Sequence, residues 1–155
     1  MALVVCLAVA FATGAIGSIA SINAASFYAT LDRPSWAPPA GVFGPVWTTL
    51  YVTIGVAMWL VWREGPGTAR RTAVGWWLAQ LAANALWSWL FFGWHLGAWA
   101  FAEVLLLWAL IVATMVAFAR VRRLAAWLLL PYLAWVTFAS ALTWSVWQRN
   151  PGALG

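Results

Sequence analysis

The chain has 155 residues, of which 66% are apolar and only 7% are charged, and its formal net charge is +5. A soluble domain carries about a quarter charged residues, so this composition excludes a water-soluble globular protein and predicts a chain embedded in a lipid bilayer. All eight basic residues are arginines at the ends of apolar stretches. They form no continuous phosphate-binding face, which argues against a nucleic-acid partner.

Five stretches are long and apolar enough for transmembrane helices, which need about 20 such residues to cross about 30 Å of hydrocarbon. Glycine, proline, asparagine or arginine bounds each stretch. They run approximately from Leu3 to Ile22, Phe43 to Trp62, Ala73 to Gly93, Gly97 to Phe118 and Leu124 to Trp147. Residues 1–22 lack the charged start and the cleavage site of a signal peptide, so we expect them to be retained as the first span.

The pattern predicts an all-α integral membrane protein. We expect one domain over residues 1–155, a five-transmembrane-helix bundle with a long loop between helices 1 and 2. Within that loop, Leu31 to Gly41 holds Pro34, Pro38 and Pro39. Proline fixes φ and restricts the residue before it, so this segment should be extended and stiff. We predict that it forms a lid, and that Phe43 to Tyr51 begins the second helix.

The distribution of arginine predicts the orientation. Six arginines lie in the joints after the second and fourth spans: Arg63, Arg70, Arg71, Arg120, Arg122 and Arg123. Both joints are on the side of the N-terminus, whereas the opposite side has only Arg33 and Arg149. The positive-inside rule therefore places the N-terminus inside and the long loop and C-terminus outside. Whether a bacterial inner or outer membrane is occupied is not decided by the sequence.

Polar side chains within the third and fourth spans indicate where ligands could bind. Gln80, Asn84 and Trp87 share one helical face, because they are spaced by four and three residues. Amides are costly in hydrocarbon, so this face should look into the bundle. It would serve either as hydrogen-bonding glue between helices or as the polar anchor of an aromatic pocket. Glu103, with Trp99 on its face, is an intramembrane acid that needs a ligand or a structural partner.

The fifth span contains Pro131, which lacks a backbone N–H and predicts a kink. Beyond it, Trp135, Ala139 and Leu142 follow on one face, and Trp144 lies close to that face. The small Ala139 between larger residues would leave a notch, either for a ligand or for a neighbouring helix.

Two strips of small residues repeat every four positions. The first span carries Ala10, Gly14 and Ser18, and the third span carries Gly75, Ala79 and Ala83. Such strips allow helices to approach closely, either within the bundle or between protomers.

No catalytic constellation is visible in the sequence. The chain has one histidine, His95, and one cysteine, Cys6. These two residues are too few to form a typical metal site. A Ser-His-acid triad would have to use His95, which has no acid nearby in sequence. No phosphate-binding or dinucleotide motif is present. We therefore expect no catalytic residue, no metal site and no required cofactor.

Several motifs recur in a recognisable order along nearly the whole chain. They are Arg33-Pro34-Ser35-Trp36-Ala37-Pro38-Pro39, then Val42-Phe43-Gly44-Pro45-Val46-Trp47-Thr48-Thr49-Leu50-Tyr51, Gln80-Leu81, Asn84, Trp87, Phe91-Phe92-Gly93, Pro131-Tyr132-Leu133-Ala134-Trp135 and Phe138-Ala139. Together they resemble the TspO/MBR family of tryptophan-rich sensory and translocator proteins.

The resemblance implies a five-helix membrane protein, usually a homodimer, that binds porphyrins such as protoporphyrin IX and haem, and isoquinoline carboxamide and benzodiazepine-type drugs. It implies ligand-binding residues at nine matched positions: Tyr28, Trp36, Trp47, Asn84, Trp99, Trp135, Ala139, Leu142 and Trp144. To these the polar faces add Gln80, Trp87 and Glu103. Family dimers through the third span would use the strip of Gly75, Ala79 and Ala83.

The chain departs from the family pattern at two places. Gly41 stands where many members have an aromatic residue, which removes a stacking surface from the loop. The animal cholesterol motif has a tyrosine and a following basic residue, where this chain has Trp144 and Gln148, with Arg149 displaced by one position. This departure argues against cholesterol as a ligand.

Our hypothesis from the sequence is a membrane protein that binds tetrapyrroles and has a sensory, regulatory or transport role. The macrocycle would stack on Trp47, Trp135 and Trp144, with Asn84 or Gln80 bonded to a polar edge. Two alternatives stay open. One is a transporter of tetrapyrroles or other small hydrophobic molecules. The other is an enzyme that degrades porphyrins in light through Trp47 and Trp144.

Overall fold

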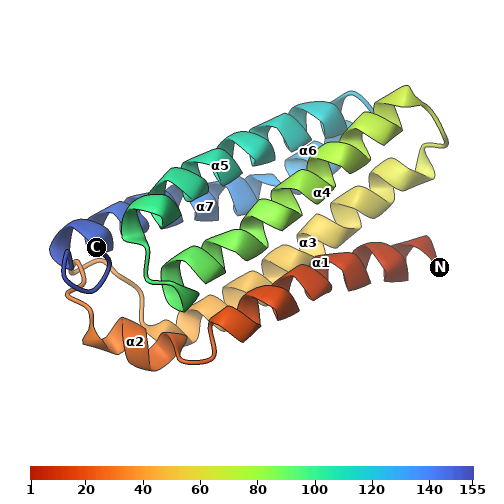
Figure 1. The fold of residues 1–155 in the computed structure, drawn as a ribbon. Coiled ribbons are helices and arrows are strands. Elements are labelled where there is room, and N and C mark those ends of the chain that lie inside the picture. The colour runs from red at the N-terminus through yellow and green to blue at the C-terminus, as the bar shows by residue number, and fades with distance from the viewer.

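The computed structural model describes residues 1–155, and all of its regular secondary structure is helical (Figure 1). The elements are α1 (Ala2–Ala20), α2 (Ala24–Thr30), η1 (Ala40–Val42), α3 (Phe43–Arg63), α4 (Thr68–Ser88), η2 (Trp89–Gly93), α5 (Gly97–Ala119), α6 (Arg123–Trp127) and α7 (Leu130–Arg149). The long helices α1, α3, α4, α5 and α7 run side by side in an elongated bundle (Figure 1).

Four segments are long and apolar enough to cross a membrane: Ala2–Ala20, Ala40–Arg63, Gly97–Ala119 and Arg123–Arg149. The expected third span is not among them. Helix α4 begins at Thr68 rather than near Ala73, so it includes Arg70 and Arg71 as well as two amide side chains. Length and composition therefore support four spans, and the predicted count of five is not confirmed by this measure.

The long loop contains a helix that the sequence analysis did not predict. Helix α2 has three alanines among its seven residues, and alanine is the strongest helix former. Residues 31–39 have no regular helix, as their prolines predict, and include a turn in which the Ala37 N–H donates to the Pro34 carbonyl at 3.0 Å. The loop is thus one short helix followed by a proline-rich segment.

Pro131 produces a break between two helices rather than a kink within one. Helix α6 ends at Trp127, and α7 begins at Leu130 with Pro131 in its first turn. Proline is well tolerated there, because the first N–H groups of a helix have no intrahelical acceptor to lose. Pro45 stands in the first turn of α3 for the same reason.

The two ends of the bundle differ in charge. The N-terminus lies at the same end as the α3–α4 and α5–α6 joints, whereas α2 and the C-terminus lie at the opposite end (Figure 1). An ion pair between Arg122 and Glu64 ties the two joints together. The six arginines predicted to share one side therefore do share one end of the molecule.

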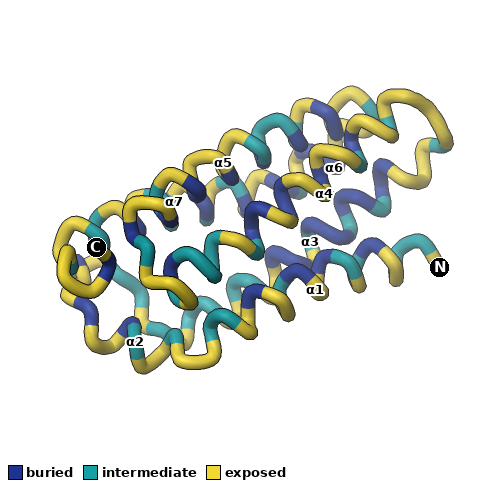
Figure 2. Tube along the Cα trace, viewed as in Figure 1, coloured by how far each residue is buried: buried dark blue, intermediate teal, exposed yellow.

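Buried residues line the inside of the bundle along its length (Figure 2). The main core joins 23 buried residues, among them Ile54, Leu81 and Tyr132. A second core of six lies toward the end that carries α2 and the C-terminus: Leu31, Phe91, Ala100, Leu142, Val146 and Leu154. Since Leu31 belongs to the loop and Leu154 to the C-terminal tail, this second core fixes both segments on the bundle.

The two small-residue strips have different neighbours. A Cβ on Gly14 would lie 2.7 Å from Cε2 of Tyr51, and Ala10 is buried, so these two positions of the first strip serve packing within the bundle, whereas Ser18 is exposed. On α4, Gly75 and Ala79 are exposed and Ala83 is buried. Nothing lies within 4 Å of a Cβ placed on Gly75. The second strip therefore runs from the outer surface into the core.

Candidate functional site

A groove of about 620 Å³ lies between α3 and α7. Its walls come from the first turns of α3 and the first half of α7. The lining residues are Pro45, Val46, Thr49, Leu50, Pro131, Ala134, Trp135 and Phe138. The groove is almost entirely apolar, and its size falls within the range of about 300–1,000 Å³ typical of small-molecule sites.

The proline-rich loop reaches this groove through Trp36. The Trp36 ring meets Phe138 edge-on, with ring centroids 5.8 Å apart. Trp135 packs between Phe43 at 5.8 Å and Phe138 at 5.4 Å. A loop residue, the start of α3 and the middle of α7 thus form one aromatic cluster at the groove.

Tyr28 of α2 holds the proline-rich loop in place through its hydroxyl and its ring. It is buried, and its hydroxyl donates to the Pro38 carbonyl at 2.8 Å. The Arg33 guanidinium lies over its ring at 4.7 Å, and the Phe43 ring packs edge-on at 5.6 Å. Burial raises the pKa of Tyr28, and Arg33 opposes that rise. The phenol therefore stays neutral and keeps its hydrogen available for Pro38.

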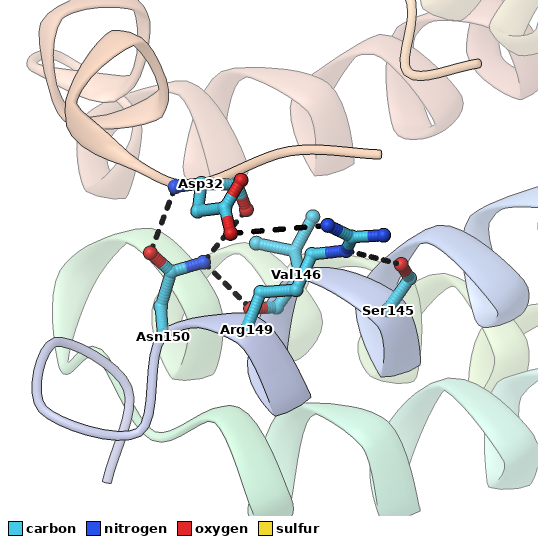
Figure 3. Close-up of polar contacts among 5 residues, drawn as sticks. All are labelled: Asp32, Ser145, Val146, Arg149 and Asn150. Atoms are coloured by element: carbon cyan, nitrogen blue, oxygen red, sulfur yellow. Dashed lines mark hydrogen bonds and ion pairs between the residues drawn. The ribbon is translucent and has the colours of Figure 1, made fainter. Parts of the chain in front are cut away.

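The C-terminal end of α7 also holds the loop, through contacts with Asp32 (Figure 3). The Asn150 side chain accepts from the Asp32 N–H and donates to the Asp32 carbonyl, each at 2.8 Å. The same amide donates to the Val146 carbonyl at 2.8 Å, and Arg149 lies 3.8 Å from the Asp32 carboxylate. We call this set of contacts the Asn150 clasp.

A polar network occupies the middle of the bundle. The Tyr51 hydroxyl donates to Asn84 Oδ1 at 2.7 Å, and Asn84 Nδ2 donates to the Tyr132 hydroxyl at 2.9 Å. Tyr132 in turn donates to Gln80 Oε1 at 2.7 Å. The network joins α3, α4 and α7, which is the role of polar glue that one interpretation of Gln80 and Asn84 predicted.

Three side chains have buried polar atoms without a protein partner. They are Nε2 of Gln80, Nε1 of Trp87 and both carboxylate oxygens of Glu103. Trp87 stacks on Phe91 at 5.1 Å, so its ring is packed although its N–H is not bonded. Buried groups of this kind are normally satisfied by water or a ligand.

The three tryptophans on which the macrocycle is expected to stack make no ring contact with one another. Trp47 contacts Tyr51 and Tyr132 on the core side, whereas Trp144 is 47% exposed and packs against Phe101 and Trp147. Trp135 and Trp144 are nine residues apart, about two and a half helical turns, and so face opposite ways. Trp47 and Trp135 nevertheless both pack against the main core, whereas Trp144 lies apart with Phe101 and Trp147.

Other predicted site residues are also dispersed. Trp99 is 68% exposed on the outer surface while Glu103 is buried, so the two do not share an environment. Leu142 is buried in the second core, and Ala139 is partly buried on α7 but does not line the groove. Of the twelve predicted residues, Trp135 alone is among those lining the groove, and Trp36 contacts its wall.

Two kinds of residue were missed by sequence reasoning. Tyr51 and Tyr132 lie inside predicted spans, where a hydroxyl needs a hydrogen-bond partner. Like Gln80, they could have been identified from the cost of a polar group in hydrocarbon. Asn150 bonds to Asp32, 118 residues away in sequence. No local pattern signals that contact.

Together, the long apolar helices, the internal polar network and the groove at an aromatic loop define a multi-pass helical membrane protein. The TspO/MBR family model matches residues 2–148. The chain belongs to this family, and the resemblance seen in its motifs is confirmed.

Curated relatives cover most of the chain. The "Translocator protein" of Homo sapiens is 44% identical over 131 residues, which are 83% of this chain and 78% of that protein. The "Tryptophan-rich protein TspO" of Chlorobaculum tepidum is 40% identical over 153 residues, 97% of each chain. "Protein CrtK" of Rhodobacter capsulatus is 39% identical over 142 residues, 90% of this chain and 86% of that protein.

Proposed function

We propose that this protein binds tetrapyrroles such as protoporphyrin IX or haem in the membrane, in the groove between α3 and α7. The observation that carries the proposal is the groove itself, an apolar space of about 620 Å³ with Trp135 in its wall and Trp36 at its edge. Flat conjugated rings stack on aromatic faces, so Trp135 and Phe138 would contact the macrocycle.

The loop would supply polar contacts at the rim. Arg33 is exposed and lies over Tyr28, next to the segment that carries Trp36. A guanidinium binds carboxylates in bidentate geometry, so Arg33 is suited to a propionate of the ligand. In this arrangement Gln80 and Asn84 do not contact the macrocycle. Their bonds to Tyr132 and Tyr51 instead hold the helices that form the groove.

The proposed topology has five spans, with the N-terminus inside and the long loop and C-terminus outside. Helix α4 is less apolar than the others, but it packs against both α1 and α5 within the bundle (Figure 1). Both polar atoms of the Asn84 amide and the carbonyl oxygen of Gln80 are bonded within the bundle, which lowers the cost of these side chains in hydrocarbon. The six arginines at one end then set the orientation.

A homodimer through α4 is part of the proposal. Gly75 and Ala79 are exposed on α4, and the space beside Gly75 is open. Small residues on an outer helix face permit close approach of a second helix. Ala83 is buried and would not take part directly.

Titration with protoporphyrin IX tests the binding proposal. We expect saturable quenching of tryptophan fluorescence and a shift of the porphyrin absorbance band. Trp135→Ala should weaken binding about tenfold, because stacking and burial of the ring are both lost. Trp99→Ala, on the outer surface, is the matched control and should change affinity less than twofold. Equal effects of the two changes would place the ligand elsewhere.

A further inference from the structure

A second cavity lies apart from the groove, between other elements of the bundle. It has a volume of about 600 Å³ and is formed by the end of α1, by α2 and by η2. The residues that line it are Ile19, Ala20, Ile22, Asn23, Ser26, Phe27, Thr30, Trp89, Phe92, Gly93 and His95. We call it the α2 cavity. None of these residues lines the α3–α7 groove.

The walls of the α2 cavity differ in chemistry. The ends of α1 and η2 supply apolar groups, among them Ile19, Trp89 and Phe92. Ser26 and Thr30 are four residues apart on α2 and share one polar face, which Asn23, the residue just before the helix, extends. An apolar wall beside a polar one matches an amphipathic molecule at the surface of a membrane.

Backbone irregularities converge on this cavity. Element η2 is a π-helix, a form that is rare and often found at functional sites. His95 is the single non-glycine residue of the chain with positive φ, at 55°. Its ring stacks face to face on Phe27, with centroids 4.0 Å apart. Strained backbone of this kind is concentrated at binding sites, where surrounding contacts hold it in place.

The free hydrogen-bonding groups indicate what the cavity would accept. The Ser26 hydroxyl donates its hydrogen to the Asn23 carbonyl, and the Thr30 hydroxyl donates to the Phe27 carbonyl. Both oxygens therefore offer only lone pairs to a ligand. The Asn23 side chain does not cap α2, and an amide can both donate and accept.

These groups favour a hydroxyl over a phosphate. A phosphate has only acceptors to present at neutral pH, and no arginine or lysine lines the cavity to neutralise it. A ligand hydroxyl can donate to Ser26 or Thr30 and accept from Asn23 or His95. A lining without arginine or lysine thus disfavours an anionic headgroup, since its desolvation would go uncompensated.

We propose that the α2 cavity binds a membrane lipid with an uncharged, hydroxyl-bearing headgroup of the acylglycerol type. Its acyl part lies against Ile19, Trp89 and Phe92, and its hydroxyl meets the polar face of α2. This proposal is independent of tetrapyrrole binding, because the two sites share no residue.

Photolabelling of the full chain in lipid nanodiscs tests the proposal. A diacylglycerol with a photoreactive group on its acyl chain should label residues 19–30 and 89–95. Unlabelled diacylglycerol should compete with the probe, whereas phosphatidylglycerol should not compete. Glycerol alone should not compete either, because it lacks the acyl chain that contacts the apolar wall. Labelling spread evenly over the bundle, or equal competition by phosphatidylglycerol, would overturn the proposal.

Two variants sharpen the test. His95→Gly removes the ring but suits the positive φ, so the fold should be retained. Binding should weaken about fivefold, as for one lost hydrogen bond. Thr30→Val removes a lone-pair acceptor at nearly constant shape and should act similarly, whereas Thr49→Val in the α3–α7 groove is its matched control. Unchanged labelling in both cavity variants would contradict the assignment. Porphyrin titration of His95→Gly and Thr30→Val should be unaffected, because neither residue lines the α3–α7 groove.

Discussion

Tyr132 is the residue on which the internal polar network depends. Its hydroxyl accepts from Asn84 and donates to Gln80, while Tyr51 makes a single bond to Asn84. Tyr132 is also fully buried in the main core. A change at this oxygen therefore affects two partners that have no access to water.

We predict that Tyr132→Phe destabilises the protein by about 1–3 kcal/mol, because it leaves the Asn84 amide and the Gln80 carbonyl without a partner. Tyr51→Phe should cost less, since it removes one bond. The measurement is equilibrium unfolding in detergent micelles, with both variants under the same conditions. A larger loss in Tyr51→Phe would show that Tyr132 is not the centre of the network.

Gly97 is a position where the lack of a side chain is required. A Cβ there would lie 2.5 Å from Cδ1 of Trp147 and 2.8 Å from the Leu154 carbonyl. We predict that Gly97→Ala destabilises by about 1–3 kcal/mol through overpacking. Gly41→Ala is the control, because nothing lies within 4 Å of its Cβ and a change below about 0.5 kcal/mol is expected. Thermal unfolding of the pair would reveal the difference, and similar midpoints would contradict it.

At the scale of elements, the loop is fixed at both of its ends. Tyr28 bonds Pro38 within the loop, while the Asn150 clasp ties Asp32 to the end of α7 (Figure 3). The tail that follows α7 also packs, since Leu154 is buried and its carbonyl accepts from the Gly97 N–H at 3.1 Å. Order in the loop is therefore linked to order in the C-terminal tail.

Asn150→Ala should loosen the loop. Three side-chain hydrogen bonds are lost, two of them to Asp32. We expect amide hydrogen exchange in residues 31–37 to become at least about tenfold faster, which corresponds to about 1.4 kcal/mol of local stability. Gln148→Ala, an exposed neighbour on α7, should leave exchange unchanged. Protection that persists in Asn150→Ala would mean that Tyr28 and Leu31 alone hold the loop.

Elements were predicted best where their apolar runs are bounded by strong stop signals. The second and fourth expected spans agree with α3 and α5 within one residue at each end. The expected third span begins near Ala73, after the true start of α4 at Thr68. Arg70 and Arg71 were assigned to the joint before it, although arginine is a good helix former. Helix α2 was missed because a seven-residue helix has too little periodicity to detect.

At the scale of the whole molecule, the number of spans depends on whether α4 crosses the membrane. Helix α4 is not among the helices that are apolar enough to cross a membrane, whereas its position in the bundle matches that of the other long helices (Figure 1). The two possibilities differ in the side on which the C-terminus emerges. With five spans it lies opposite the N-terminus, and with four it lies on the same side.

We predict five spans, so a reporter fused after the C-terminus should lie on the side opposite the N-terminus. A second reporter placed at Gly65, in the α3–α4 joint, should lie on the N-terminal side with the six arginines. Alkaline phosphatase and green fluorescent protein fusions in a bacterial host distinguish the sides. A C-terminal reporter on the N-terminal side would support four spans and remove α4 from the membrane.

The amino-acid sequence by itself determined the membrane environment, the long helices α3 and α5, the grouping of six arginines and the family, because each depends on composition, local periodicity or ordered motifs. Only the tertiary structure decided which faces meet. It separated Trp144 from Trp47 and Trp135, exposed Trp99, bonded Gln80 and Asn84 to tyrosines, and joined Asn150 to Asp32. Helical periodicity tells which residues share a face, but the rotation of each helix against its neighbours depends on packing between distant parts of the chain.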